Sequence, residues 1–353
     1  MARKSIRRIV LQLVATVVAT LATLPLSAAI ARSVSDVAPQ ANAADDARYQ
    51  KLIEATNAVV AVKVKALADA RSNKSLGQER EGSGVLIGKE GLVLTIGYLI
   101  LEADTIEVTD FEGKTVSAAA VAYDHATGFG LVRPIGKVSG RPIRMGTAQP
   151  VSQLDRMMIV TGGGEQNISI ATVVSKRPFA GYWEYLIDDA IFTSPPRLDH
   201  SGAALINKDG ELVGIGSLLV MDALTPGERL PGNMFVPVDL LKPILDEMVR
   251  TGGQQSARRP WLGVNSLEED GRVKVMQVNE ESPADKAGIV AGDIILSVNG
   301  EAVESLEKFY RKLWTHGPAG VDVNLTVLHG PVLKEVTVRS IDRHEFMRRK
   351  PGV

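Results

Sequence analysis

The sequence contains no cysteine among its 353 residues, which excludes disulfides, thiolate catalysis and cysteine-ligated metal sites. Aromatic residues are scarce as well, at 5% of the chain. The chain also lacks an excess of charge of one sign, since 40 basic and 41 acidic residues leave a net charge of −1. Without a global basic field, the charge gives no support to nucleic acid as a partner.

Glycine is frequent, with 33 residues, and the chain is 45% hydrophobic and 23% charged, as expected for a folded soluble protein. Between residues 82 and 235, short apolar runs alternate with turn signals such as Gly-Lys-Glu-Gly at 88–91 and Lys-Asp-Gly-Glu at 208–211. Several strands spaced by about 8–12 residues are typical of a sandwich or barrel. The pattern therefore predicts a β-rich fold.

The N-terminus has the composition of an export signal. Four basic residues within positions 3–8 precede an apolar stretch at 9–30, and Ala-Asn-Ala at 41–43 fits a cleavage site. The alternative is an uncleaved anchor in the inner membrane formed by residues 9–30, because about 20 apolar residues can span a bilayer. Removal of residues 1–43 leaves 35 basic and 40 acidic residues, a net charge of −5.

Composition and periodicity divide the rest of the chain into two folded units. Residues 239–250 show apolar residues at helical spacing, with Asp239 as the expected N-cap and Gly252 as a stop signal. The Gly/Gln/Ser/Arg-rich stretch that follows predicts a linker. The expected divisions are a signal or anchor at 1–43, a first unit at 44–250, a linker at 251–259, a second unit at 260–342 and a basic tail at 343–353.

The order of motifs in the first unit resembles the HtrA (DegP-like) family of exported trypsin-like serine proteases, which carry a C-terminal PDZ domain. The matching segments are Gly-Ser-Gly-Val-Leu-Ile at 82–87, Gly-Leu-Val-Leu-Thr at 91–95, Ser-Gly-Ala-Ala-Leu-Ile at 201–206, 210–215 and Phe-Val-Pro at 235–237. The resemblance covers roughly residues 50–342. It implies a mostly β chain, with a trypsin-like double β-barrel followed by a smaller α+β PDZ domain.

The resemblance also implies a degenerate catalytic site. A serine nucleophile needs a histidine to take its proton and an aspartate to orient that histidine. Ser201 stands at the family's nucleophile position, but Tyr98 stands at the histidine position and Gly128 at the aspartate position. Asp199 replaces a glycine of the oxyanion motif and places a carboxylate near the developing negative charge. Loss of the base or nucleophile costs about six orders of magnitude in kcat, so we expect a pseudoprotease with a vestigial Ser201.

A weak serine endopeptidase with an atypical base remains the alternative reading. Tyr98 could hydrogen-bond Ser201, although a phenol with a pKa near 10 is a weak base at neutral pH, and a core-filling role for its ring is the simpler reading. His200 adjoins Ser201 but neighbouring side chains usually diverge, and His125 reaches the site only if the strand register differs. The histidines of the chain are His125, His200, His316, His329 and His344.

The second unit resembles an HtrA-type PDZ domain through segments 261–264, 282–284, 287–288, 292–295 and 298–300. By that resemblance, the loop of Trp261, Leu262, Gly263 and Val264 offers backbone N–H groups to a peptide's terminal carboxylate. The peptide then adds as a strand opposite a helix at 305–314. Val264, Leu306, Phe309 and Leu313 line the pocket for its last side chain or fill the domain core.

These features together predict an exported, periplasmic protein of protein quality control that binds unfolded polypeptides or protein C-termini. The chain's own C-terminal Val353 is of the kind that PDZ domains accept. The family resemblance implies a homotrimer or a mixed trimer with active homologues. The sequence contains no motif for a metal or an organic cofactor.

Overall fold

A computed structural model describes residues 43–88, 90–163, 167–253 and 258–348. The expected export signal or anchor, including the apolar stretch at 9–30, therefore lies outside the described residues except for Ala43, and so does Val353. Within the described ranges, no helix is both long enough and apolar enough to cross a membrane.

The first barrel follows helix α2 (Ala43–Asn57) and closes in an antiparallel order of six strands. Around the barrel these are β1 (Val59–Ala66), β2 (Glu79–Ile87), β3 (Leu92–Ile96), β6 (Phe129–Pro134), β5 (Thr115–Tyr123) and β4 (Ala103–Thr109). A short helix α3 (Asn73–Leu76) lies between β1 and β2, and the 3-10 turn η1 (Gly97–Leu99) follows β3. This turn carries Tyr98 towards the second barrel.

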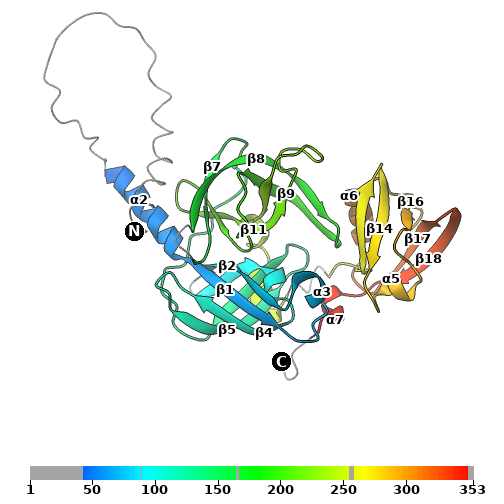
Figure 1. Cartoon of the computed structure of the whole chain (residues 1–353), viewed down its shortest axis with the longest axis horizontal. Helices are drawn as coiled ribbons and strands as arrows, with labels where there is room; N and C mark the ends of the chain where they lie inside the picture. Colours follow the sequence, from blue (N-terminus) through cyan, green and yellow to red (C-terminus); the bar gives the residue numbers. More distant parts are fainter. Residues whose placement is uncertain (1–42, 89, 164–166, 254–257, 349–353) are drawn as a thin grey trace, which may run out of the picture.

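The second barrel is also closed. Around it lie β10 (Ala204–Ile206), β11 (Leu212–Val220), β12 (Gly232–Pro237), β9 (Tyr185–Ser194), β8 (Ile168–Gly181) and β7 (Arg156–Val160). In Figure 1, β8 and β9 extend beyond their barrel towards the C-terminal unit. The prediction of a mostly β chain with two barrels is confirmed.

The helix expected over 239–250 is interrupted. The structure has the 3-10 turn η2 (Val238–Leu240) and a shorter helix α4 (Leu245–Thr251), with Pro243 between them. Proline lacks an N–H donor and cannot continue the helical ladder. Asp239 does not cap the helix, because its carboxylate accepts from the Ala148 amide at 2.6 Å and from Lys242 Nζ at 2.9 Å. Gly252 ends α4 in the left-handed conformation, as the sequence predicts.

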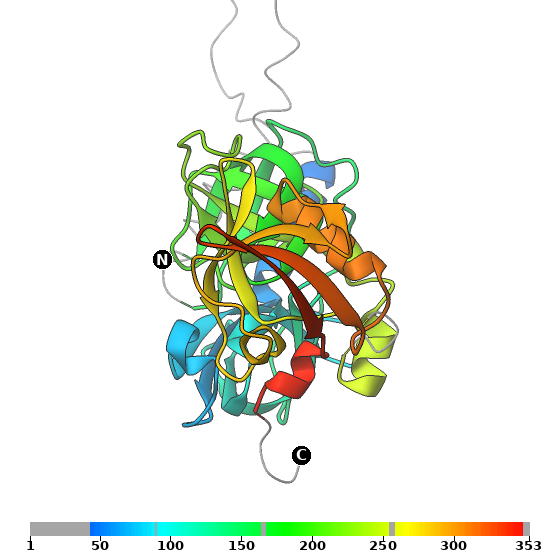
Figure 2. The same cartoon turned by 90° about the vertical axis from the view of Figure 1, so that its right-hand side faces the viewer.

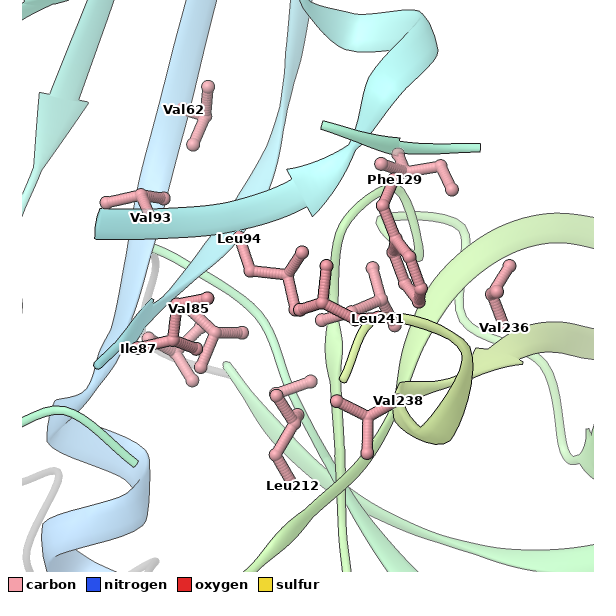
Figure 3. Close-up of a cluster of buried hydrophobic side chains, with 14 of the residues drawn as sticks. Val62, Val85, Ile87, Val93, Leu94, Phe129, Leu212, Val236, Val238 and Leu241 are labelled. Carbon is pink, nitrogen blue, oxygen red and sulfur yellow. The ribbon is translucent and has the colours of Figure 1, made fainter. Parts of the chain in front are cut away.

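A single buried apolar cluster joins the two barrels. Figure 3 shows Val85 and Leu94 of the first barrel facing Leu212 and Val236 of the second, and all four are completely or almost completely buried. Gly202 allows the closest approach, since a Cβ atom there would lie 1.9 Å from the Ser83 carbonyl oxygen. The Ser-Gly pair at 201–202 therefore has a packing function that is independent of catalysis.

The C-terminal unit is an antiparallel sheet with three helices. Its strands are β13 (Val264–Glu269), β14 (Arg272–Val278), β15 (Ile294–Val298), β17 (Asp322–His329) and β18 (Val332–Arg339), with β16 (Glu301–Ala302) beside β15. Its helices are α5 (Pro283–Lys286), α6 (Leu306–Thr315) and α7 (Arg343–Phe346). Figure 2 views the molecule from this side, with the sheet in front of the barrels.

The first residues of the expected basic tail form α7 and touch the first barrel. His344 Nε2 lies 2.9 Å from the Tyr123 carbonyl oxygen, and Nδ1 lies 3.0 Å from Asp342 Oδ1. The Arg348 amide donates to Glu102 at 2.7 Å. Residues 344–348 thus connect the C-terminal unit to the first barrel.

Candidate functional site

Ser201 lies in the turn before β10, facing η1 of the first barrel. Its hydroxyl oxygen is 2.7 Å from the Tyr98 hydroxyl, which is also 2.8 Å from the Ser217 carbonyl oxygen. A phenol has one proton, and a carbonyl oxygen only accepts. When Tyr98 donates to Ser217, the Ser201 hydroxyl must donate to Tyr98, so the phenol oxygen is the acceptor in this arrangement. Across the described residues, Tyr98 is the one side chain hydrogen-bonded to Ser201 Oγ.

Tyr98 is a poor acceptor for the full transfer of that proton. Burial raises the pKa of Tyr98 to about 12, against a weaker opposing effect of the Ser201 hydrogen bond. At neutral pH, roughly one molecule in 10⁵ then carries the phenolate. The contact satisfies two hydroxyls without creating an activated nucleophile.

The backbone at Gly128 leaves little room for a carboxylate. Its φ is +79°, and a Cβ atom there would lie 3.0 Å from the Tyr185 hydroxyl oxygen. Tyr185 is 4% exposed and donates to the Thr127 carbonyl oxygen at 2.7 Å. A tyrosine from the second barrel therefore fills the space beside the family's aspartate position.

Asp199 is paired, which the sequence argument did not anticipate. Arg197 donates through Nε to Oδ1 at 2.8 Å and through Nη2 to Oδ2 at 2.6 Å, and Thr161 Oγ1 donates to Oδ2 at 3.0 Å. Burial raises the pKa of Asp199, but these hydrogen bonds outweigh it and leave that pKa below its ordinary value. The carboxylate stays ionised beside Ser201, with its charge compensated by a guanidinium.

Neither histidine near the site hydrogen-bonds Ser201. His200 Nδ1 lies 3.2 Å from the Arg197 carbonyl oxygen, and burial lowers the pKa of His200. The His125 ring packs 4.2 Å from the Tyr123 ring and 4.1 Å from the His344 ring, between centroids. Both His125 ring nitrogens are buried without a hydrogen-bond partner in the described part of the chain.

The loop at 261–264, called the carboxylate loop below, holds a carboxylate in this structure. The amides of Leu262, Gly263 and Val264 donate to the side chain of Glu184, with shortest N···O distances of 3.0, 2.7 and 3.1 Å. Gly263 has a φ of +89°, which permits this row of N–H groups to point to one spot. Glu184 comes from the turn between β8 and β9.

The predicted pocket residues are all buried in one cluster. The cluster contains the four predicted pocket residues Val264, Leu306, Phe309 and Leu313, and also Leu262 of the carboxylate loop, each no more than 4% exposed. Trp261, 5% exposed, packs its ring against Phe346 at a centroid distance of 4.7 Å. The cluster also contains a residue that the sequence analysis did not single out, Leu186 of β9.

A cavity of about 290 Å³ lies between the barrels and the C-terminal unit. Tyr98 and Gly128 line its barrel side, Trp261 and Asn265 line the opposite side, and Trp183 of the β8–β9 turn lies between them. The surroundings of Tyr98 and Gly128 and the loop that begins at Trp261 therefore open into a common aromatic space. No group of three or more metal-ligating side chains occurs within the described residues.

Sequence comparisons agree with both halves of this architecture. Residues 82–215 match the trypsin-like peptidase domain family, and residues 260–339 match the PDZ domain family. The serine endoprotease DegS of Haemophilus influenzae is 30% identical over 246 residues, covering 66% of this chain and 69% of that protein. A probable periplasmic serine endoprotease DegP-like of Pseudomonas fluorescens is 27% identical, covering 77% of this chain and 59% of that protein.

Solved structures share the fold. The HtrA-type protease AlgW with a decapeptide superposes with a TM-score of 0.53 at 19% identity, covering 86% of this chain and 99% of the other. These matches agree with the double barrel and the C-terminal sheet unit of the structure. The chain belongs to the HtrA family of trypsin-like serine proteases with a PDZ domain.

Proposed function

We propose that this chain is a non-catalytic HtrA-family protein that binds unfolded polypeptides or protein C-termini through its PDZ domain. The observation that carries the proposal is the pairing of Ser201 with the Tyr98 hydroxyl at 2.7 Å. A phenol whose pKa is raised by burial to about 12 leaves the serine without a base in the neutral range.

The binding half of the proposal rests on the carboxylate loop. Three amides in a row converge on one carboxylate, which is the chemistry needed to hold a peptide's C-terminus. In this proposal, the edge strand β13 accepts the peptide as an added strand, and the apolar residues of α6 receive its last side chain. The solved structure of the relative AlgW contains a decapeptide.

The location and assembly are part of the same proposal. We place the chain in the periplasm, with residues 1–43 as export signal or anchor, the barrels within 44–250 and the PDZ domain within 260–342. Relatives named as periplasmic endoproteases support that location. The homotrimer or mixed trimer implied by the family resemblance stays a prediction.

The test is covalent labelling of the purified chain with a fluorophosphonate probe at neutral pH, together with cleavage of unfolded casein. We expect neither labelling of Ser201 nor cleavage, with DegS as the active reference and Ser201→Ala as the background control. Labelling or cleavage that disappears in Ser201→Ala would instead establish the weak endopeptidase. Binding is measured separately, with a fluorescein-labelled decapeptide ending in valine and its C-terminal amide as control.

A further inference from the structure

The turn between β8 and β9 enters the groove in which the proposed function places a peptide. The two strands pair out to Gly181 and Tyr185, and a three-residue loop of Tyr182, Trp183 and Glu184 joins them. Figure 1 shows this hairpin reaching from the second barrel to the C-terminal unit, beside α6 and β14. The name "groove hairpin" below refers to residues 180–186.

Glu184 occupies a position that usually selects glycine. Three-residue hairpin loops commonly end in a left-handed residue, and Glu184 has a φ of +59°. That conformation costs a non-glycine residue about 1 kcal/mol. The side chain is nevertheless held inside the structure, since Glu184 is only 6% exposed, and its carboxylate accepts from all three amides of the carboxylate loop.

The groove hairpin supplies the other two contacts expected of a PDZ ligand. The Ser266 amide of β13 donates to the Tyr182 carbonyl oxygen at 2.8 Å, which is the start of strand addition. Residues 182 to 184 run towards the carboxylate loop while β13 runs away from it, so the segment lies antiparallel to β13. Leu186 joins the buried cluster that contains Phe309 and Leu313, the predicted pocket residues.

Helix α6 closes the groove over the hairpin. The Tyr310 hydroxyl donates to the Gly181 carbonyl oxygen at 2.7 Å and accepts from the Glu184 amide at 3.1 Å. Arg311 on the same helix forms an ion pair with Asp188 of β9. Each side of the groove therefore contacts the hairpin through hydrogen bonds as well as apolar packing.

We propose that the groove hairpin is an internal ligand of the PDZ groove, with the Glu184 side chain in the place of a peptide's terminal carboxylate. The proposal rests on the proposed peptide-binding function and adds its regulation. An incoming C-terminus binds only to molecules in which the hairpin has left the groove. Peptide binding and hairpin docking are thereby mutually exclusive, and a bound peptide frees the β8–β9 turn beside the degenerate cleft.

The test compares Glu184→Gly with Asp270→Gly in the full chain. Glycine suits the positive φ at both positions, so each variant keeps its turn while removing one carboxylate. Asp270 lies at the exposed β13–β14 turn and serves as the matched control. Hydrogen–deuterium exchange of segment 261–266 is followed without peptide, and the affinity for the valine-ending decapeptide is measured by fluorescence anisotropy.

In Glu184→Gly, we expect faster exchange of segment 261–266 and at least about tenfold tighter peptide binding, because a closed groove lowers the apparent affinity by its open fraction. Asp270→Gly should match the wild type in both measurements. Equal exchange in Glu184→Gly and wild type would overturn the internal ligand. Faster exchange without binding of the decapeptide by either protein would overturn the proposed peptide binding while keeping the hairpin as the occupant of the groove.

Discussion

Tyr185 packs beside Gly128, the residue that the family resemblance places at the aspartate position. The phenol of Tyr185 is anchored on the Thr127 carbonyl oxygen and stands 3.0 Å from where a Cβ of residue 128 would be. The backbone there has a φ of +79°, which disfavours any side chain. Replacing Gly128 alone therefore meets both a conformational and a steric penalty.

Gly128→Asp should lower the free energy of unfolding by about 2 kcal/mol or more, measured by urea denaturation. Left-handed strain accounts for about 1 kcal/mol, and the contact with Tyr185 adds about 1–3 kcal/mol of overpacking. Gly113→Asp is the control, because Gly113 has a φ of +85° but no atom within 4 Å of its would-be Cβ. Equal losses in the two variants would show that Tyr185 imposes no steric barrier at position 128.

At the scale of the element, the docking of the groove hairpin in the PDZ groove depends on pH. Burial raises the pKa of Glu184 to about 7, although the three amides and the charge of Arg343 act in the opposite direction. Tyr310 and Arg343 also contact the turn, since the Tyr310 hydroxyl accepts from the Glu184 amide and Arg343 Nη1 lies 3.4 Å from the Trp183 carbonyl oxygen. Burial raises the pKa of Tyr310, so this phenol stays neutral. Burial of the ionised carboxyl thus weakens docking above neutral pH.

Peptide affinity should consequently rise with pH. The Glu184 carboxyl has a pKa of about 7 in the docked hairpin, whereas an ordinary glutamate has a pKa of 4.5. Between pH 4.5 and pH 7 the docked hairpin therefore binds more protons than the undocked hairpin. Docking is strongest below pH 4.5 and weakens as the pH rises through 7, which releases the groove. We expect the wild type to bind the decapeptide roughly tenfold more tightly at pH 8 than at pH 5.5. Glu184→Gly should show little change, and an equal pH effect in that variant would assign the titration to another group.

On the scale of the whole molecule, Tyr98 connects the two barrels. It comes from η1 of the first barrel, and its hydroxyl contacts both Ser201 and the Ser217 carbonyl oxygen of the second. The same junction holds the Ser83 amide, which donates to the Ser201 carbonyl oxygen at 2.8 Å. In the proposed non-catalytic protein, these contacts stabilise the barrel interface.

Tyr98→Phe should therefore destabilise the chain by about 1–2 kcal/mol, because it leaves the Ser217 carbonyl and the Ser201 hydroxyl without their shared partner. The measurement is the shift of the urea midpoint at constant slope. Tyr182→Phe, which removes a hydroxyl from a half-exposed ring, should leave the midpoint unchanged. A midpoint equal to that of the wild type in Tyr98→Phe would mean that the hydroxyl contributes nothing to the interface.

The fold class was predictable from the sequence and is confirmed, because it depends on local order. The assignment of Tyr98, Gly128 and Asp199 to altered catalytic positions uses the same local motifs and stays a prediction. Gly-Ser-Gly at 82–84 and Ser-Gly at 201–202 sit in short strand-and-turn motifs, and the spacing from Thr95 to Tyr98 is fixed within one turn. The helix expected over 239–250 was wrong in extent, because Pro243 lies within it and the structure has a helix only over Leu245–Thr251. The turns and strand ends in these motifs depend on residues that are adjacent in the sequence.

Only the tertiary structure decided which side chains lie against the carboxylate loop and beside Gly128. Glu184 reaches amides 78–80 residues further along the chain, and Tyr185 reaches Thr127 across 58 residues. No local pattern marks such contacts, since they arise only when two barrels and a sheet pack against one another. The sequence by itself therefore determined which residues stand at the positions that the family resemblance assigns to catalysis, because that order is local. The packing of distant elements decided which side chains lie beside those positions and which segment lies against the carboxylate loop.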